Sequence, residues 1–167
     1  DKAREYLKAS SFASGFPVQM SISLDLASWM EPAALLIQES LGQLGITTTI
    51  ERIPGANWRT VALVDKSLDF HLENFGGWLN TPDYYFFWVY QRDRLFNSSS
   101  YDNEEVQALS ERALHMATDN PEWAPLIKRM FKIVMEDLPR IPLYQPALNV
   151  AVNGASGYEF WFHRQLD

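Results

Sequence analysis

The chain has 167 residues, of which 47% are hydrophobic, and its formal net charge is −7. This length suits one domain, and the apolar content is enough for a core without disulfides. Because the chain contains no cysteine, thiolate chemistry and cysteine-ligated metals are excluded. The basic residues are scattered, which argues against nucleic-acid binding, since that needs a basic stripe. No apolar stretch approaches the roughly 20 residues that span a bilayer.

The N-terminal residues predict a helix over 2–9, without a start methionine, a signal peptide or a lipid-attachment cysteine before it. We therefore expect a piece of a longer protein, although processing gives the same kind of N-terminus. Gly15 and Pro17 break this helix. Residues 18–24 then alternate strictly between apolar and polar side chains, which predicts a strand with one buried face.

A helix and a second strand are predicted next. The apolar positions of the helix recur at helical spacing and are Met30, Ala33, Ala34, Ile37, Leu41 and Leu44. Ser28 and Glu31 have the spacing of a capping box, and Gly45 stands where a left-handed C-cap is expected. Residues 46–53 are rich in β-branched side chains and predict a strand. The order strand, helix, strand predicts a βαβ unit with parallel strands.

A short helix over 57–67, capped by Asn57, and a third strand over 68–78 are predicted to follow. The rest is mainly helical. Asp102 and Glu105 have capping-box spacing before a helix, and its apolar stripe is Val106, Leu109, Ala113 and Met116.

Asn120 as cap and Pro121 at the first position predict the next helix, with an apolar stripe of Trp123, Ile127, Met130 and Val134. Pro139 and Pro142 end it. An extended segment and a short strand over 148–152 follow. One α/β domain over 1–167 accounts for the whole chain.

The stretch ENFGGWLNTPDYYFFW, residues 73–88, sets two glycines among aromatic residues. Gly76 and Gly77 let a strand end bend or let the backbone approach another group closely. In an open α/β sheet, ligands bind beyond the carboxyl ends of the strands, where residues 78–83 are expected. The candidate ligand-binding residues are Trp78, Leu79, Asn80, Thr81 and Asp83, with Trp29 at the other strand end.

For Trp78 and Trp29, a structural role is the alternative to ligand binding. Trp78 offers a stiff ring face and one N–H donor for a ligand, but it can equally fill the core. Trp29 can line the same cleft or pack over the start of its helix. Thr81 and Asp83 are candidate polar anchors. Four aromatic residues further on are expected to pack the core, namely Phe86, Phe87, Trp88 and Tyr90.

No metal or cofactor is expected. His71, His115 and His163 lack metal-ligand spacing, and no phosphate-binding or nucleophile motif occurs. Carboxylates are plentiful, so a small hydrolase using Glu73 and Asp83 is an alternative from another class, and it requires a pocket in which the two converge. A pure interaction domain is a third alternative, and it requires a large exposed apolar patch.

Five stretches in order resemble the C-terminal lobe of the family 5 extracellular solute-binding proteins, the oligopeptide- and dipeptide-binding proteins of ABC importers. They cover nearly the whole chain and are DKAREYLKASSFASGF (1–16), IQESLGQLGITTTIERI (37–53), SLDFHLENFGGWLNTPD (67–83), FNSSSYDNEEVQALSERA (96–113) and DLPRIPLYQP (137–146).

The resemblance implies a fold and a function. The fold is α/β, one lobe of a periplasmic-binding-protein type II fold with a mixed sheet flanked by helices. The function is that of a periplasmic or cell-surface receptor, lipid-anchored or not, that closes on a ligand by hinge motion and docks on a membrane permease. The ligand is then a peptide or another small molecule, the N-terminal lobe is missing here, and the isolated piece is expected to bind poorly.

The sequence departs from the dipeptide-binding relatives in two places. Those relatives hold the peptide's amino group with an Asp just after Gly-Trp, whereas this chain has Asn80 and Thr81 there and Asp83 only after Pro82. Relatives that hold a short peptide's carboxylate use an Arg near the start of the helix at 29–44, and this chain has none. A dipeptide therefore fits poorly. A longer peptide is the first expectation, and an oligosaccharide or an opine-like compound is the alternative.

Overall fold

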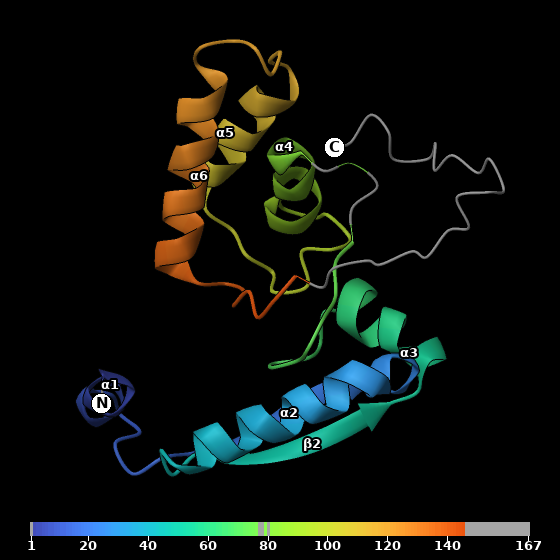
Figure 1. Cartoon of the computed structure of the whole chain (residues 1–167), viewed down its shortest axis with the longest axis vertical. Coiled ribbons are helices and arrows are strands. Elements are labelled where there is room, and N and C mark those ends of the chain that lie inside the picture. The colour runs from blue at the N-terminus through green and yellow to red at the C-terminus, as the bar shows by residue number, and fades with distance from the viewer. Residues whose placement is uncertain (1, 77–78, 80, 146–167) are drawn as a thin grey trace, which may run out of the picture. The chain divides into compact units, whose positions relative to one another are not determined.

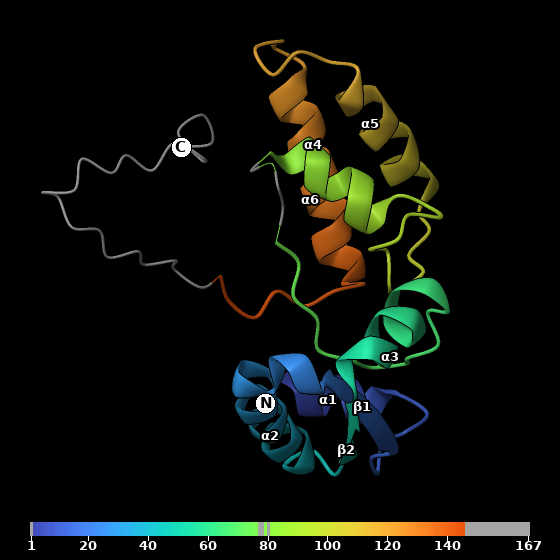
Figure 2. The same ribbon diagram turned by 90° about the vertical axis from the view of Figure 1, so that its right-hand side faces the viewer.

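The computed structural model describes residues 2–76, 79 and 81–145, which form two compact units (Figures 1 and 2). Unit 1 is Asp1–Gly76 with Leu95–Ser100, and unit 2 is Gly77–Arg94 with Tyr101–Asp167. That the whole chain forms one domain stays a prediction. The last predicted strand, over 148–152, lies outside the described residues. No helix in the described part is long and apolar enough to cross a membrane.

Unit 1 is built on a small parallel sheet. Its elements are α1 (Lys2–Ala9), β1 (Pro17–Ser23), a 3₁₀ turn (Leu24–Leu26), α2 (Ala27–Gly42), β2 (Thr47–Ile53), α3 (Gly55–Arg59) and a π-helical turn (Thr60–Val64). β1 and β2 pair in parallel, with Pro17 opposite Thr47 and Ser23 opposite Ile53. α2 runs along β2 (Figure 1), so the predicted βαβ unit is confirmed.

The core of unit 1 contains two apolar clusters. The first joins β1 to α2, and its buried members are Met20, Ile22, Met30, Ala34 and Leu72. The second lies around α3, and its buried members are Ile53, Trp58, Ala62 and Leu63. The helical spacing along α2 thus correctly predicted buried positions, and the alternation along residues 18–24 did so for Met20 and Ile22. The prediction of a single buried face is wrong, because Leu24 is 45% exposed and the polar residues Ser21 and Ser23 are each only 2% exposed.

Two glycines make the turns before β1 and β2 possible. Gly15 has φ = +90° and Gly45 has φ = +83°, and both values lie in the region that side chains disfavour. The two backbones also touch, because a Cβ on Gly15 would lie 2.0 Å from the carbonyl oxygen of Gly45. The left-handed conformation predicted for Gly45 is confirmed.

The predicted third strand is reduced to one bridge in the described structure. Ser21 N donates to Phe70 O at 2.9 Å, and Leu72 N donates to Ser21 O at 3.1 Å. A strand needs this exchange to repeat along its length, and beyond Leu72 the chain turns aside so that Phe75 meets the ring of Phe96, with ring centroids 4.9 Å apart.

Two predicted caps in unit 1 are wrong. α2 begins at Ala27, directly after the 3₁₀ turn, so Ser28 and Glu31 lie inside the helix. Glu31 instead accepts a hydrogen bond from Nε of Arg52 on β2 at 3.0 Å. Asn57 also lies inside its helix, since α3 begins at Gly55.

Replacing Thr48 by valine is expected to stabilise unit 1. Thr48 is 7% exposed, and its hydroxyl has no hydrogen-bond partner in the described structure. A buried hydroxyl without a partner is unfavourable, and valine has nearly the same shape and suits a strand. We expect Thr48→Val to raise the free energy of unfolding by about 1 kcal/mol in urea titrations. The exposed Thr49→Val is the control, and a loss of stability at position 48 would contradict the assignment.

Unit 2 is helical. It contains α4 (Pro82–Tyr85), a π-helical turn (Phe86–Tyr90), α5 (Glu104–Leu114) and α6 (Trp123–Asp137). α5 and α6 pack together beside α4 (Figure 2). The buried members of their shared core are Phe86, Val106, Ala113, Leu126, Ile127, Met130, Ile133 and Val134. Both stripes predicted from helical spacing therefore lie in this core or pack against it.

The predicted start of α5 is one residue too early. Asn103 is the cap, because its Oδ1 accepts from the backbone N–H groups of Glu105 at 3.1 Å and Val106 at 3.2 Å. Asp102 instead binds the guanidinium of Arg92, at 2.9 Å and 2.6 Å.

The predicted start of α6 is also early. α6 begins at Trp123, while Oδ1 of Asn120 accepts from the backbone of Glu122 within the preceding turn. At its other end, Leu138 takes a left-handed conformation just before Pro139, as expected for a helix that cannot continue.

Glu105 makes the stability of unit 2 depend on pH in a predictable direction. Two hydrogen bonds from Arg129, at 2.6 Å and 2.8 Å, hold the pKa of Glu105 below its ordinary value of 4.5. A carboxylate whose pKa is lower in the folded state than in the unfolded state stabilises the fold at pH values above the unfolded-state pKa. This stabilisation is lost as the pH falls through the folded-state pKa. We expect Glu105→Gln to lower the melting temperature at pH 7, with the difference closing below about pH 4.

The control for this prediction is Glu111→Gln, which removes an exposed carboxylate elsewhere on α5. A difference between the wild type and Glu105→Gln that persists unchanged at pH 3 would show that the pair with Arg129 does not stabilise the fold.

Candidate ligand-binding site

The described candidate residues Leu79, Thr81 and Asp83 lie at the start of α4 in unit 2. Thr81 is the N-cap residue, with extended backbone angles of φ = −121° and ψ = 140°, and Pro82 occupies the first helical position. Leu79 is 48% exposed, and Asp83 lies in the first turn. The described candidates Leu79, Thr81 and Asp83 are thus near neighbours, while Trp78 and Asn80 lie outside the described residues.

Asp83 has an unusual environment. Its Oδ1 is shielded from solvent and accepts no hydrogen bond in the described structure. A shielded carboxylate oxygen without a donor is costly, and its chemistry suits an ammonium group or another donor. Thr81 adds a hydroxyl two residues earlier, since its side chain makes no capping hydrogen bond to the helix.

The aromatic residues after Asp83 divide into two groups. Phe86 is 1% exposed and packs edge-on against Phe131, while Tyr90 lies 5.3 Å from the Phe86 ring. The predicted packing role is confirmed for these two. Phe87 and Trp88 are only partly buried, and the guanidinium of Arg94 lies 3.9 Å from the Phe87 ring centre.

Trp29 lies on α2 in unit 1. It is partly buried and packs against the cluster around Met30, which is the contact that the packing alternative requires. A ligand-binding role for Trp29 stays a prediction. A Cβ at Gly76 would meet nothing within 4 Å. The close backbone approach suggested for this position is therefore absent, and it does not require glycine here.

A polar cluster in unit 1 was not predicted from the sequence. The hydroxyl of Ser98 donates to Oε2 of Glu73 at 2.6 Å, and Nε2 of His71 lies 3.2 Å from the same hydroxyl and 3.5 Å from the same carboxylate oxygen. The rings of His71 and Trp58 make a T-shaped contact, with their centroids 5.8 Å apart. No local spacing reveals this cluster, because Ser98 is 25 residues from Glu73.

The geometry of this cluster does not form a nucleophile relay. In such a relay a carboxylate holds one imidazole nitrogen while the other takes the serine proton. Here serine and carboxylate both lie at Nε2, and the serine hydroxyl already donates to Glu73. Glu73 is thus held in a structural network, and this arrangement gives no support to the hydrolase alternative.

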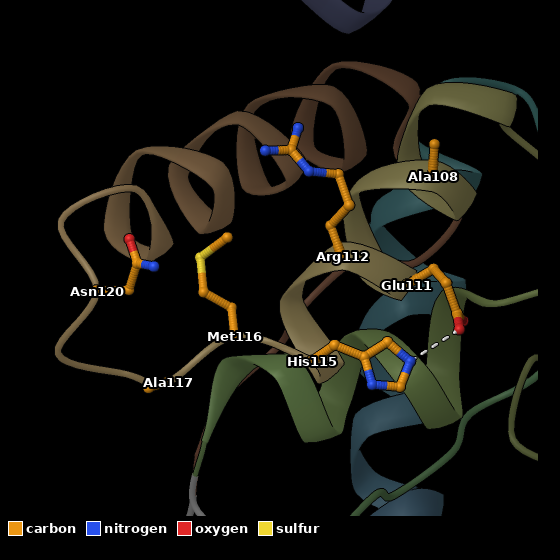
Figure 3. A pocket seen from close by; sticks show the side chains of 7 residues that line it. All are labelled: Ala108, Glu111, Arg112, His115, Met116, Ala117 and Asn120. Atoms are coloured by element: carbon orange, nitrogen blue, oxygen red, sulfur yellow. Dashed lines mark hydrogen bonds and ion pairs between the residues drawn. The ribbon is translucent and has the colours of Figure 1, made fainter.

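A shallow depression of about 520 Å³ lies elsewhere in unit 2. Side chains of α5 and the following loop line it (Figure 3), among them His115, which binds Glu111 at 3.2 Å. None of the predicted ligand-binding residues lines it. Among the described residues, no three side chains of the metal-binding types gather into a site, and His163 lies outside them.

Comparison with known proteins supports the resemblance seen in the sequence. No family model matches the chain. The chain is 31% identical over 131 residues to the probable D,D-dipeptide-binding periplasmic protein DdpA of Escherichia coli K12, covering 74% of this chain and 24% of DdpA. The fold matches the periplasmic binding protein DppA of Helicobacter pylori, solved with the peptide STSA, with a TM-score of 0.70 and 22% identity over 83% of this chain and 27% of DppA.

The chain resembles the family 5 extracellular solute-binding proteins over most of its length. Another solved relative is AgaA of A. tumefaciens R10, in complex with agropinic acid, which matches with a TM-score of 0.72 and 20% identity over 83% of this chain and 28% of AgaA. The chain thus spans about a quarter of the length of each of these three relatives. The predicted fold class, a lobe-type α/β fold of a periplasmic binding protein, is confirmed. All three of these proteins are described as binding proteins.

Proposed function

We propose that this chain is the C-terminal lobe of the substrate-binding component of an ABC importer, and that the ligand is an oligopeptide. The observation that supports this most is the fold match over 83% of the chain to DppA, solved with the peptide STSA. The 31% identity to the probable D,D-dipeptide-binding protein DdpA supports a peptide ligand in general, although a dipeptide is shorter than the ligand proposed here. In this proposal a second lobe completes the cleft, and hinge closure traps the peptide.

The chemistry at the entrance of α4 supports a ligand with an amino group. The shielded oxygen of Asp83 accepts no hydrogen bond in the described structure, so a ligand ammonium would restore a partner to it. Leu79, four residues earlier in the sequence, is exposed and offers an apolar contact. Trp78 and Asn80 complete the proposed binding stretch on sequence grounds, and Trp29 is the further candidate from α2.

The second candidate ligand is an opine-like compound. The fold match to AgaA in complex with agropinic acid favours it. An oligosaccharide is supported by the sequence alone, with Trp29 and Trp78 as candidate stacking platforms.

The proposal includes a cellular location and two partners. The protein works in the periplasm or at the cell surface, its N-terminal lobe lies outside these residues, and its closed form docks on an ABC permease. The permease is implied by the ABC-associated relative. Because half of such a cleft belongs to the other lobe, this lobe alone would bind peptides weakly or not at all.

Asp83→Asn in the full-length gene product tests the proposal. An ion-paired hydrogen bond is stronger than a neutral one, so we expect the variant to raise the Kd for a peptide with a free amino terminus by about tenfold or more. The Kd for the same peptide with an acetylated amino terminus should change little. The measurement is isothermal titration calorimetry with a peptide pool retained by the wild type.

The control is Asp119→Asn, an exposed carboxylate of the loop before α6. Equal loss of affinity for both forms of the peptide would reject Asp83 as the amino-group anchor. Absence of peptide binding by the wild type would reject the peptide ligand itself.

A further inference from the structure

The proposed ligand-binding stretch lies in an excursion of the chain away from unit 1. The chain leaves unit 1 after Gly76 and returns to it at Leu95, so residues 77–94, which include the ligand-binding stretch, are joined to unit 1 at both ends. The segments on either side, residues 71–76 and 95–100, both belong to unit 1, and we call them the two stems. Contacts between the stems therefore limit the freedom of the excursion that they carry.

Two side-chain contacts join the stems in the same register. The Ser98 hydroxyl donates to Oε2 of Glu73 at 2.6 Å, and the rings of Phe75 and Phe96 make a T-shaped contact with their centroids 4.9 Å apart. Phe75 follows Glu73 by two residues, and Phe96 precedes Ser98 by two. The stems thus run antiparallel, with side chains facing each other at alternate positions.

The returning stem is fixed in the core of unit 1. Leu95 and Phe96 both pack against the buried cluster around Trp58. The hydrogen bond from Ser98 to Glu73 ties the outgoing stem to this fixed one, so its loss would free the outgoing stem in particular.

His71 extends the hydrogen bond between the stems into a chain of three groups. The Ser98 hydroxyl has one proton, which it donates to Glu73, so its oxygen accepts from Nε2–H of His71 at 3.2 Å. The side chains of His71 and Glu73 are 10% and 11% exposed, and Ser98 is 5% exposed. A hydrogen bond to a carboxylate is stronger than a neutral one, and a shielded carboxylate that loses a donor pays more for it.

We propose that Ser98 is a positioning residue for the ligand, because its hydrogen bond to Glu73 clasps the two stems together and so holds the ligand-binding stretch ready for a peptide. This inference rests on the proposed function. Closing the ends of a segment removes conformations that it would otherwise sample, and a ligand then binds without first having to order it. Glu73 stands five residues before Trp78, where the stretch begins, so freedom at this stem passes directly along the chain. Ser98 itself touches no ligand in this account.

Hydrogen exchange of the full-length gene product without ligand tests the clasp. In Ser98→Ala we expect amides of the stems to exchange at least about tenfold faster than in the wild type, among them Leu72 N, which donates to Ser21 O, and Ser100 N, which donates to Asn97 O. The amides of β2 should keep their wild-type rates. Ser99→Ala is the matched control, since it removes the hydroxyl of the exposed next residue, and it should exchange like the wild type.

Peptide affinity tests the positioning role. Titration calorimetry is done with a peptide retained by the wild type, at a temperature at which all variants are folded, so that a change in overall stability alone leaves the Kd unchanged. We expect Ser98→Ala to raise the Kd by at least about threefold, because only the clasped fraction of the molecules is ready to bind. Ser99→Ala should bind like the wild type.

Four results would overturn the inference. Unchanged exchange at the stems would reject the clasp, and faster exchange in β2 as well would show that Ser98 supports unit 1 as a whole. Faster exchange at the stems with an unchanged Kd would reject the positioning role alone and leave the proposed function standing. Absence of peptide binding by the wild type would reject the proposed ligand and this inference with it.

Discussion

Replacing Gly15 by alanine is expected to lower the free energy of unfolding by about 3 kcal/mol. Two effects add here. The left-handed backbone at φ = +90° costs a side chain about 1–2 kcal/mol, and the new Cβ would lie 2.0 Å from the carbonyl oxygen of Gly45. That contact involves backbone on both sides, so relief requires a shift of the turn that leads into β2, at a further cost of about 1–3 kcal/mol. Urea unfolding followed by tryptophan fluorescence measures the change.

Gly42→Ala is the matched control for this prediction. Gly42 is the last residue of α2, and a Cβ there would meet nothing within 4 Å. Alanine is the better helix former, so we expect this variant to be stabilised by up to about 0.5–1 kcal/mol. If Gly15→Ala proved as stable as Gly42→Ala, the close turn between residues 15 and 45 would be wrong.

Met130→Ala is expected to destabilise unit 2 by about 2–5 kcal/mol, the usual cost of removing a large buried side chain from a core. Met130 is 0% exposed and lies in the cluster that joins α5, α6 and Phe86. Lys128→Ala, two residues earlier on the exposed face of the same helix, should change stability by less than about 0.5 kcal/mol. The measurement is again urea unfolding, and equal effects at the two positions would contradict the assigned face of α6.

The features that sequence predicted well are those set by local periodicity. The alternation of residues 18–24 reflects β1, where Met20 and Ile22 are both buried. The helical spacing of Ile127, Met130 and Val134 likewise marks the buried face of α6. These patterns survive because burying apolar side chains at a regular period is the largest favourable contribution to folding.

Features that depend on competition between nearby polar groups were harder to predict. Asp102 and Asn103 are both good caps, and the choice of Asn103 depends on Arg92, which binds Asp102 from ten residues away. Glu31 was predicted to cap α2 but instead accepts a hydrogen bond from Arg52, 21 residues further along the chain. The network of His71, Glu73 and Ser98 depends on the same kind of distant partner. Of the proposed binding stretch, the sequence pointed to Asp83, but only the structure revealed that one of its carboxylate oxygens is shielded from solvent and lacks a donor.

Native mass spectrometry of the full-length gene product, purified from the periplasm without added ligand, tests the central claim most directly. A receptor that encloses its ligand should retain it through purification, and fragmentation of the released mass should give a ladder of amino-acid differences. We expect a set of bound peptides longer than two residues. A single bound mass without amino-acid fragments would contradict the peptide ligand and favour the opine-like alternative. A gene product of 167 residues with no bound mass would contradict the receptor itself.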